Sequence, residues 1–198
     1  MMKTGKNKRL LASILAASML LAMSPFALAE GTEGQEQSQG QPAEQTYAAK
    51  IVDGETVTQY ETLAGAIYKA NSDVTIVMLR DVTENIEINK SLTLDLGGHT
   101  LSGDGKKTVV SISGKGNDID VTVKHGTITG GYEINGGGFD IQSGNIKIEN
   151  CIIEKNTAKS AGGGVNIGGS ANVTITGSEI RNNTAIGSSG GAIYLASG

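Results

Sequence analysis

The sequence predicts an all-β protein, a right-handed single-stranded parallel β-helix (solenoid) with a short N-terminal capping helix. Two phrases recur in step about every 25–28 residues, which indicates stacked, similar units. Glycine makes up 29 of 198 residues, about twice the usual share of roughly 7%, and aromatic residues only 4%. So many glycines are expected where the backbone must turn tightly and often. The first phrase occurs as Leu94-Asp-Leu96, Val121-Thr-Val123, Ile146-Lys-Ile148 and Val173-Thr-Ile175; the second, Gly-Gly-Gly or Gly-Gly-Ala before an apolar alternation, occurs at 136–141, 162–167 and 190–195.

The N-terminus has the features of a secretory signal peptide over residues 1–29. Four Lys and Arg side chains lie within the first nine residues, and the apolar stretch 10–23 is too short to span a bilayer comfortably. Ala27-Leu-Ala29 then supplies an A-x-A cleavage site. The alternative is an uncleaved N-terminal anchor. We expect a secreted, extracellular or cell-surface protein with no transmembrane segment after signal cleavage.

Residues 30–46 are a polar tract of Glu, Gln, Gly and Ser, for which we predict a disordered linker, because it cannot bury enough apolar area to offset chain entropy. Cleavage removes four positive and no negative charges, so the formal net charge changes from −4 to about −8. An acidic chain argues against nucleic-acid binding, which requires a basic face. Cys151 is the only cysteine, and we interpret it as a buried structural thiol rather than a nucleophile.

Residues 47–73 are predicted to form an N-terminal cap that starts with a hairpin. Two short strand-like runs, 49–52 and 55–60, flank Asp53-Gly54, which is a hairpin turn signal.

A helix is predicted over 62–71, with Thr62 as its N-cap and Asn71 as its stop. A solenoid needs a cover over its exposed strand edges, so we assign the helix to capping rather than to partner binding. The apolar residues that fall at i, i+3, i+4 and i+7 are Leu63, Ala66, Ile67 and Ala70.

Residues 74–198 are predicted to form the coils. Strands of three to five residues joined by Gly-rich corners, with no helices between them, exclude a βαβ sheet. Coils that stack at the strand spacing of about 4.8 Å place equivalent side chains above one another in inward ladders. Four ladders are predicted: Leu94, Val121, Ile146 and Val173; Leu96, Val123, Ile148 and Ile175; Leu101, Ile128, Ile153 and Ile180; Ile112, Ile141, Ile167 and Leu195.

Asn156 and Asn183 occupy the same place in successive coils, three residues after an inward isoleucine. We expect an inward asparagine ladder that binds backbone amides; the alternative is a pair of solvent-facing turn residues. The residues to which a structural role is assigned are Asn156, Asn183, Gly162, Gly163, Gly190, Gly191, Ile153 and Ile180.

The outward positions carry no recognisable constellation for catalysis or metal binding. Glycosidases need two carboxylates about 5–9.5 Å apart, and calcium-assisted lyases need several clustered oxygen ligands. In a β-helix, such groups would be acids at equivalent positions of successive coils. The expected outward columns contain no such pair: Asp95, Thr122, Lys147 and Thr174; Ser111, Asp140, Asn166 and Tyr194; Gly97, Lys124, Glu149 and Thr176.

The remaining polar motifs are weak signals. His125-Gly126 resembles a fragment of the glycosidase pattern of this fold but lacks the Asp-Asp element of that pattern, and His99 is interpreted as a turn residue. Exposed ion pairs, worth little energetically, are expected between Lys124 and Glu149 and between Lys147 and Asp95. No catalytic, cofactor-binding or metal-binding residue is predicted, and no cofactor.

Two pairs of motifs resemble the repeat of polymorphic outer-membrane proteins, in which F-x-x-N precedes G-G-A-I. They are Ile153-Glu-Lys-Asn156 before Gly162-Gly-Gly-Val165 and Ile180-Arg-Asn-Asn183 before Gly190-Gly-Ala-Ile193. Isoleucine replaces phenylalanine in both, a conservative change inside a core. More broadly, residues 74–198 resemble bacterial pectate-lyase-like β-helix proteins of the secreted adhesin type. The resemblance implies a secreted or surface-exposed protein, but no barrel or sorting signal is present from which to infer its anchoring.

Three functions are compatible with these features. The first is a non-catalytic, adhesin-like scaffold that binds extracellular polysaccharide or a cell-surface partner. The second is a polysaccharide lyase or glycoside hydrolase whose site lies on coils beyond residue 198, and the third is a structural spacer. Ile193-Tyr-Leu195 precedes only Ala-Ser-Gly, without a polar cap, so we expect residues 74–198 to be the first part of a longer β-helix.

Overall fold

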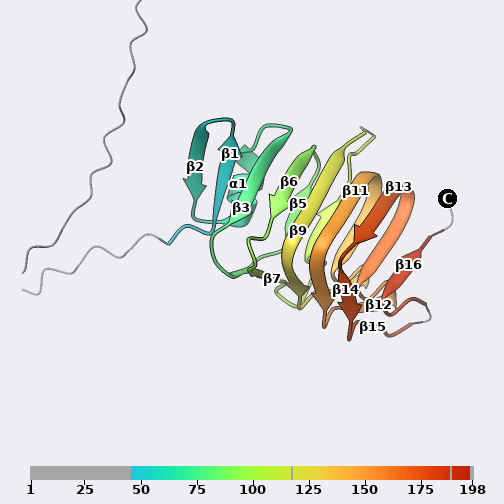
Figure 1. The fold of residues 1–198 in the computed structure, drawn as a ribbon. Coiled ribbons are helices and arrows are strands. Elements are labelled where there is room, and N and C mark those ends of the chain that lie inside the picture. The colour runs from blue at the N-terminus through green and yellow to red at the C-terminus, as the bar shows by residue number, and fades with distance from the viewer. Residues whose placement is uncertain (1–45, 117, 188, 197–198) are drawn as a thin grey trace, which may run out of the picture. The chain divides into compact units, whose positions relative to one another are not determined.

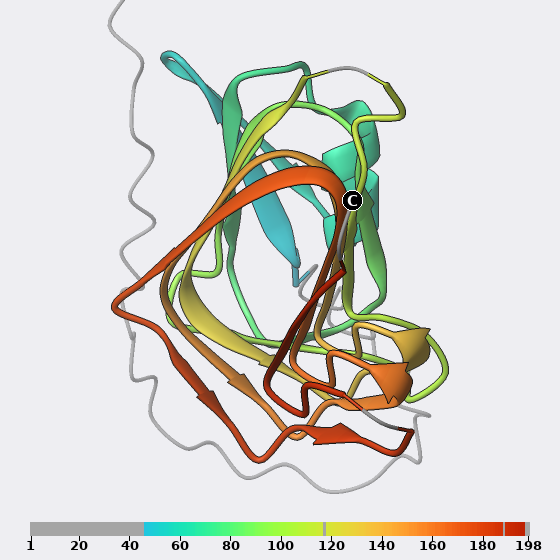
Figure 2. The same cartoon turned by 90° about the vertical axis from the view of Figure 1, so that its right-hand side faces the viewer.

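The computed structural model describes residues 46–116, 118–187 and 189–196, and it confirms the parallel β-helix (Figure 1). Strands of successive coils pair in parallel, and seen end-on the coils superpose (Figure 2). The predicted signal peptide and all of the predicted linker except Thr46 lie outside the described residues.

Three faces of each coil belong to one continuous sheet. The first face contains β3 (Val74–Met78), β6 (Leu92–Asp95) and segments of β9 (Asp120–Thr129), β11 (Phe139–Glu154) and β13 (Val165–Thr176). The second contains β4 (Val82–Thr83), β7 (Thr100–Ser102), later segments of β9 and β11, and β14 (Glu179–Arg181). The third, called the groove face below, contains β5 (Ile86–Ile88), β8 (Val110–Ile112), the first segments of β11 and β13, and β16 (Ile193–Leu195).

A separate three-stranded parallel sheet fills the remaining side of the later coils. It consists of β10 (Tyr132–Asn135), β12 (Thr157–Ala161) and β15 (Thr184–Ala185).

The core is built from inward ladders, as expected for strands whose side chains alternate between two faces. The third and fourth predicted ladders are confirmed, and the first coil extends them with Val82 and Ile88. Most of their members are completely buried, including Leu101, Ile128 and Ile153. The ladders consist of aliphatic side chains that repeat at the strand spacing. Among the described residues, Phe139 is the only aromatic residue that is fully buried.

The predicted register of the first two ladders is wrong for the earliest coil. Leu92, not Leu94, pairs with Val121, and Leu94 pairs with Val123. Leu92, Leu94 and Leu96 all point inward, so a slip of two residues keeps every side chain on its face and the repeated triplet alone cannot distinguish the registers. The later pairings, Val121 with Ile146 and Ile146 with Val173, are as predicted.

The N-terminal hairpin extends the sheet at its first edge. Strands β1 (Ala49–Asp53) and β2 (Thr56–Tyr60) pair antiparallel, and Gly54 in the turn has a φ of 58°. Strand β1 also pairs antiparallel with β3. The hairpin therefore covers the backbone edge of β3, a role that the sequence suggested for the helix.

Helix α1 (Leu63–Lys69) is shorter than the predicted 62–71 and lies against β5 and the hairpin. Thr62 is its N-cap, with Oγ1 accepting a hydrogen bond of 3.1 Å from the Gly65 N–H. The backbone becomes extended at Ala70, so the helix ends before Asn71. Its apolar stripe is buried: Leu63, Ala66, Ile67 and Ala70.

Both ends of α1 are held by charged side chains of the next coil. The Glu84 carboxylate accepts hydrogen bonds from the N–H groups of Leu63 (3.0 Å) and Ala64 (2.8 Å). The Lys90 ammonium donates to the carbonyls of Ile67, Tyr68 and Ala70 at 2.9–3.4 Å. A carboxylate at the N-terminus and an ammonium at the C-terminus also complement the helix dipole.

We expect Lys90→Met to lower the free energy of unfolding by about 1–2 kcal/mol, because the carbonyls at the helix end lose a charged donor while the aliphatic stem is kept. Urea denaturation followed by circular dichroism measures the change. Lys69→Met is the matched control, since Lys69 lies in the same last turn but is exposed, with its ammonium over the Tyr68 ring rather than at those carbonyls. Equal losses of unfolding free energy in the two variants would contradict a stabilising role of Lys90 at the end of α1. We call Glu84 and Lys90 together the charged clamp on α1.

None of the described helices has the length and apolar character needed to cross a membrane.

Candidate functional site

The two asparagines form the core of the turn between the second face and the three-stranded sheet. Asn156 is completely buried; its Nδ2 donates to Asn183 Oδ1 (3.1 Å) and to the Ile128 carbonyl (3.1 Å). Asn156 Oδ1 accepts from the Gly131 N–H (3.0 Å), and Asn183 Nδ2 donates to the Ile153 carbonyl (2.8 Å). Asparagine side chains therefore link successive coils through hydrogen bonds to backbone groups at this turn.

The other residues with an assigned structural role surround this turn. Ile153 is fully buried and pairs with Ile180, which packs against the core. Gly162 and Gly190 occupy equivalent corners with φ of 68° and 65°, where a residue with a Cβ is strained. A Cβ on Gly163 would lie 2.6 Å from the carbonyl oxygen of Gly191, so these glycines allow coils to approach closely.

Cys151 is 1% exposed and lies between Gly126 and Ser178 in the stack. Its thiol is positioned to donate to the carbonyls of Glu149 (3.4 Å) and Val123 (3.7 Å). Burial raises the pKa of Cys151 to about 11, which keeps the thiol protonated and unreactive at neutral pH.

We expect Cys151 to react with a thiol reagent such as DTNB at pH 8 at least about 100-fold more slowly in the folded chain than in urea. Only the thiolate attacks, and a pKa of about 11 leaves a far smaller thiolate fraction than the usual value of about 8.5. The urea-unfolded chain is the control for reagent quality. Reaction at the same rate in both states would show that the thiol is accessible.

With the corrected register, the outward columns still place no two acidic residues at paired positions of neighbouring coils. Asp95 lies beside Lys124 rather than Lys147, with its Oδ2 3.7 Å from the Lys124 ammonium and its Oδ1 3.3 Å from His125 Nδ1. The expected pairing of Lys147 with Asp95 is therefore wrong. The three outward columns that run through β3, β6 and β5 are Thr75, Thr93, Thr122, Lys147 and Thr174; Val77, Asp95, Lys124, Glu149 and Thr176; Glu87, Ser111, Asp140, Asn166 and Tyr194.

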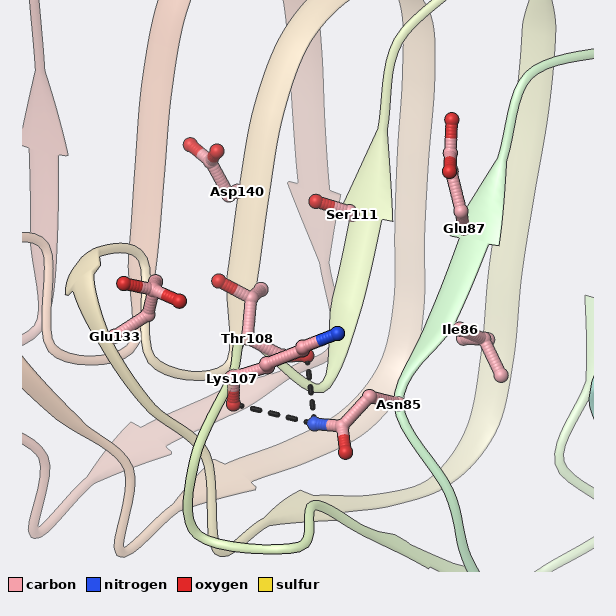
Figure 3. Close-up of a pocket in the computed structure, with 8 residues that line it drawn as sticks. All are labelled: Asn85, Ile86, Glu87, Lys107, Thr108, Ser111, Glu133 and Asp140. Carbon is pink, nitrogen blue, oxygen red and sulfur yellow. Dashed lines mark hydrogen bonds between the residues drawn. The ribbon is translucent and has the colours of Figure 1, made fainter.

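A hollow lies on the groove face. It has a volume of about 410 Å³, and Figure 3 shows Glu87, Ser111 and Asp140 side by side across three successive strands, with Lys107 and Glu133 on one side. The remaining lining residues are Asn85, Ile86 and Thr108.

Two lining side chains, those of Asn85 and Thr108, form hydrogen bonds with the backbone around this pocket. Asn85 Nδ2 donates to the carbonyls of Lys107 (3.2 Å) and Thr108 (2.9 Å) (Figure 3). Thr108 Oγ1 donates to the Gly136 carbonyl at 2.7 Å. The loop that carries Lys107 is thereby tied to the coil on either side.

A second hollow of about 430 Å³ adjoins the first on the side of α1 and shares Asn85 and Glu87 with it. Tyr68 on α1 lines it and is 79% exposed. The other lining residues are Ala64, Ile67, Asn89 and Lys90. We call the two hollows together the axial groove, because they run from α1 across β5 and β8 to β11.

The sequence columns missed most of this groove. Ser111 and Asp140 were placed in one column, but Glu87 was not, because the first coil is shorter than the repeat period. The alternation Ile86-Glu-Ile88, which matches Val110-Ser-Ile112, was the signal that could have added it. Glu133 and Tyr68 lie on other elements, and no sequence pattern brings them to this face.

Among the described residues, no group of three or more His, Cys, Asp and Glu side chains is arranged to hold a metal ion. A sequence profile of the family described as "Right handed beta helix region" matches residues 83–198, more than half of the chain. Comparisons with curated proteins and with solved structures gave no match.

Proposed function

Because the chain belongs to the right-handed β-helix family, we propose that it is a secreted or cell-surface, non-catalytic scaffold of the adhesin type. Its outer faces bind extracellular glycans or another cell-surface partner. The proposal extends to a bacterial origin and to relatedness with polymorphic outer-membrane-protein repeats, on the strength of the two Asn and Gly-Gly motifs.

One observation supports the absence of catalysis above all others. In the described coils, no outward column through β3, β6 or β5 places carboxylates in neighbouring coils, where they would lie about 4.8 Å apart. Glu87 and Asp140 are two coils apart with Ser111 between them. Each of the two is already engaged, Glu87 with Lys115 (2.8 Å) and Asp140 with Asn166 (2.7 Å).

The test is binding of the purified chain to a glycan array and to whole cells, next to an assay of polysaccharide cleavage. We expect binding on at least one of the first two and no release of unsaturated uronate or reducing ends from polygalacturonate or alginate. Binding in neither assay favours a spacer, and release of products favours the lyase or hydrolase alternative. Either result overturns the proposal.

We also expect secretion with cleavage after Ala29 when the full chain is expressed in a bacterial host, because Ala27-Leu-Ala29 fits the A-x-A pattern. Mass spectrometry of the exported protein should then give Glu30 as its first residue. Ala29→Gln is the matched variant, in which a large residue at the cleavage position should leave the precursor uncut. Export of the uncleaved wild-type chain in the membrane fraction would support an N-terminal anchor instead.

A further inference from the structure

We propose that the axial groove binds a neutral, hydroxyl-rich polysaccharide chain that lies along the stacking direction of the coils. The inference rests on the proposed glycan-binding function and deepens it by naming the site and the class of glycan.

The groove consists of two adjoining hollows. Its two hollows, of about 410 and 430 Å³, share Asn85 and Glu87, and each is within the usual size range of ligand sites. Between them they cross α1, β5, β8 and β11, and neighbouring strands lie about 4.8 Å apart. A linear ligand with a repeating unit therefore meets similar positions one coil after another.

The polar groups of the groove are mainly acceptors with fixed orientation. Asp140 Oδ1 accepts from Asn166 Nδ2 and from Gln142 Nε2, both at 2.7 Å. Glu87 Oε1 contacts the Lys115 ammonium at 2.8 Å, and Glu133 Oε1 accepts from a backbone N–H at 2.8 Å.

In each of the three carboxylates one oxygen is thus held, while none of the hydrogen bonds or ion pairs among the described residues uses the other oxygen. Ser111, between Glu87 and Asp140, adds a hydroxyl (Figure 3). Sugar hydroxyls are the complementary donors, and carboxylates held in place beforehand lose little freedom when they accept them.

The charge balance selects a neutral chain. The carboxylates of Glu87, Glu133 and Asp140 are matched in number by the ammonium groups of Lys90 and Lys107, which line the groove, and of Lys115, which contacts Glu87. The groove therefore carries no net formal charge, and it offers no net electrostatic attraction to a polyuronate or to a polycation.

Tyr68 gives the groove an apolar platform at its α1 end. Its side chain is 79% exposed although α1 buries its opposite stripe, and the Lys69 ammonium lies 5.5 Å from the ring centroid. The C–H face of a pyranose ring can pack on such a ring while its hydroxyls reach the polar groups farther along.

The test is affinity gel electrophoresis of the full chain in gels that contain hydroxyethylcellulose, galactomannan, xylan, polygalacturonate or chitosan. We expect retardation by at least one of the three neutral glycans and none by the two charged ones. Tyr68→Ala should raise the dissociation constant for the neutral glycan roughly tenfold, and Ser111→Arg, which fills the groove, at least as much. Thr122→Arg is the matched control on the first face and should leave binding unchanged.

Each alternative outcome overturns the inference. Retardation only by polygalacturonate or only by chitosan contradicts the neutral class, and neutral binding that survives both Tyr68→Ala and Ser111→Arg contradicts the site. Retardation in none of the gels contradicts the class as well. If the wild-type chain still binds the glycan array or cells in any of these cases, the scaffold function stands and only its site or ligand is different. Circular dichroism of each variant shows that it is folded.

Discussion

Replacing Gly131 by alanine is expected to lower the free energy of unfolding by at least about 3 kcal/mol. A Cβ at this position would overlap the carbonyl oxygen of Gly137 and lie 2.9 Å from a methyl group of Val109. The Gly131 backbone itself cannot move away, because its N–H donates to Asn156 Oδ1 and its carbonyl accepts from the Thr157 N–H. Urea denaturation, or the yield of folded protein if the variant is too unstable, measures the loss.

The neighbouring Gly130 supplies the control. It has a φ of 74°, and a Cβ there would meet its nearest atom, the Gly103 carbonyl oxygen, at 3.4 Å. Gly130→Ala should therefore cost only the strain of a left-handed alanine, about 1 kcal/mol. If both substitutions lower the free energy of unfolding equally, the close contact between the backbones at Gly131 does not explain why glycine is needed there.

The second large effect is expected for Asn156→Ala, with a loss of about 3–5 kcal/mol. The substitution takes from the Gly131 N–H its acceptor in a completely buried place, and it also removes the side-chain donor to the Ile128 carbonyl and to Asn183 Oδ1. Each buried polar group that loses its partner costs about 1–3 kcal/mol. The midpoint of urea denaturation and the melting temperature should both fall.

Alanine substitutions of Asn183 and Asn172 are the comparison variants for Asn156→Ala. Asn183→Ala should also lower the melting temperature but cost less, about 1–2 kcal/mol, because Asn183 is half-exposed and water can reach the freed groups. Asn172 is exposed on β13, and its side chain makes no hydrogen bond to another described residue. Its replacement by alanine should change the free energy of unfolding by no more than about 0.5 kcal/mol. A melting temperature unchanged in Asn156→Ala would refute the ladder as a source of stability.

The repeat predicted the coils well because its signal is physical and local. Inward positions such as Ile128, Ile153 and Ile180 must be apolar and must recur once per coil, so alternation and period together determine their stacking. The same argument was insufficient at Leu92–Leu96, where three inward leucines in succession permit two registers with equal burial. The offset between paired residues falls from 29 at Leu92–Val121 to 27 at Leu101–Ile128, so the corner between β6 and β7 is two residues longer than the matching corner of β9. The repeated triplet does not show on which side of the strand those two residues lie.

The axial groove shows the other limit of the sequence. Ser111 and Asp140 could be placed on one column because strands stack, but Glu133 comes from β10 and Tyr68 from α1. A concave site depends on where loops and the cap lie relative to the groove face. Those positions are set by contacts such as the hydrogen bonds of Asn85 to the loop at Lys107, which only the three-dimensional structure shows.

The charged clamp on α1 gives the assembly of this protein a direction. The cap is complete only when Glu84 and Lys90, about 20 residues later in the chain, have reached the two ends of the helix. From then on each coil offers its strand edges as a template to the next one, with pairing partners 18 to 29 residues away. Growth by addition of neighbouring coils is the behaviour of a one-dimensional array. Folding is therefore expected to start at the cap and to keep pace with synthesis, coil by coil.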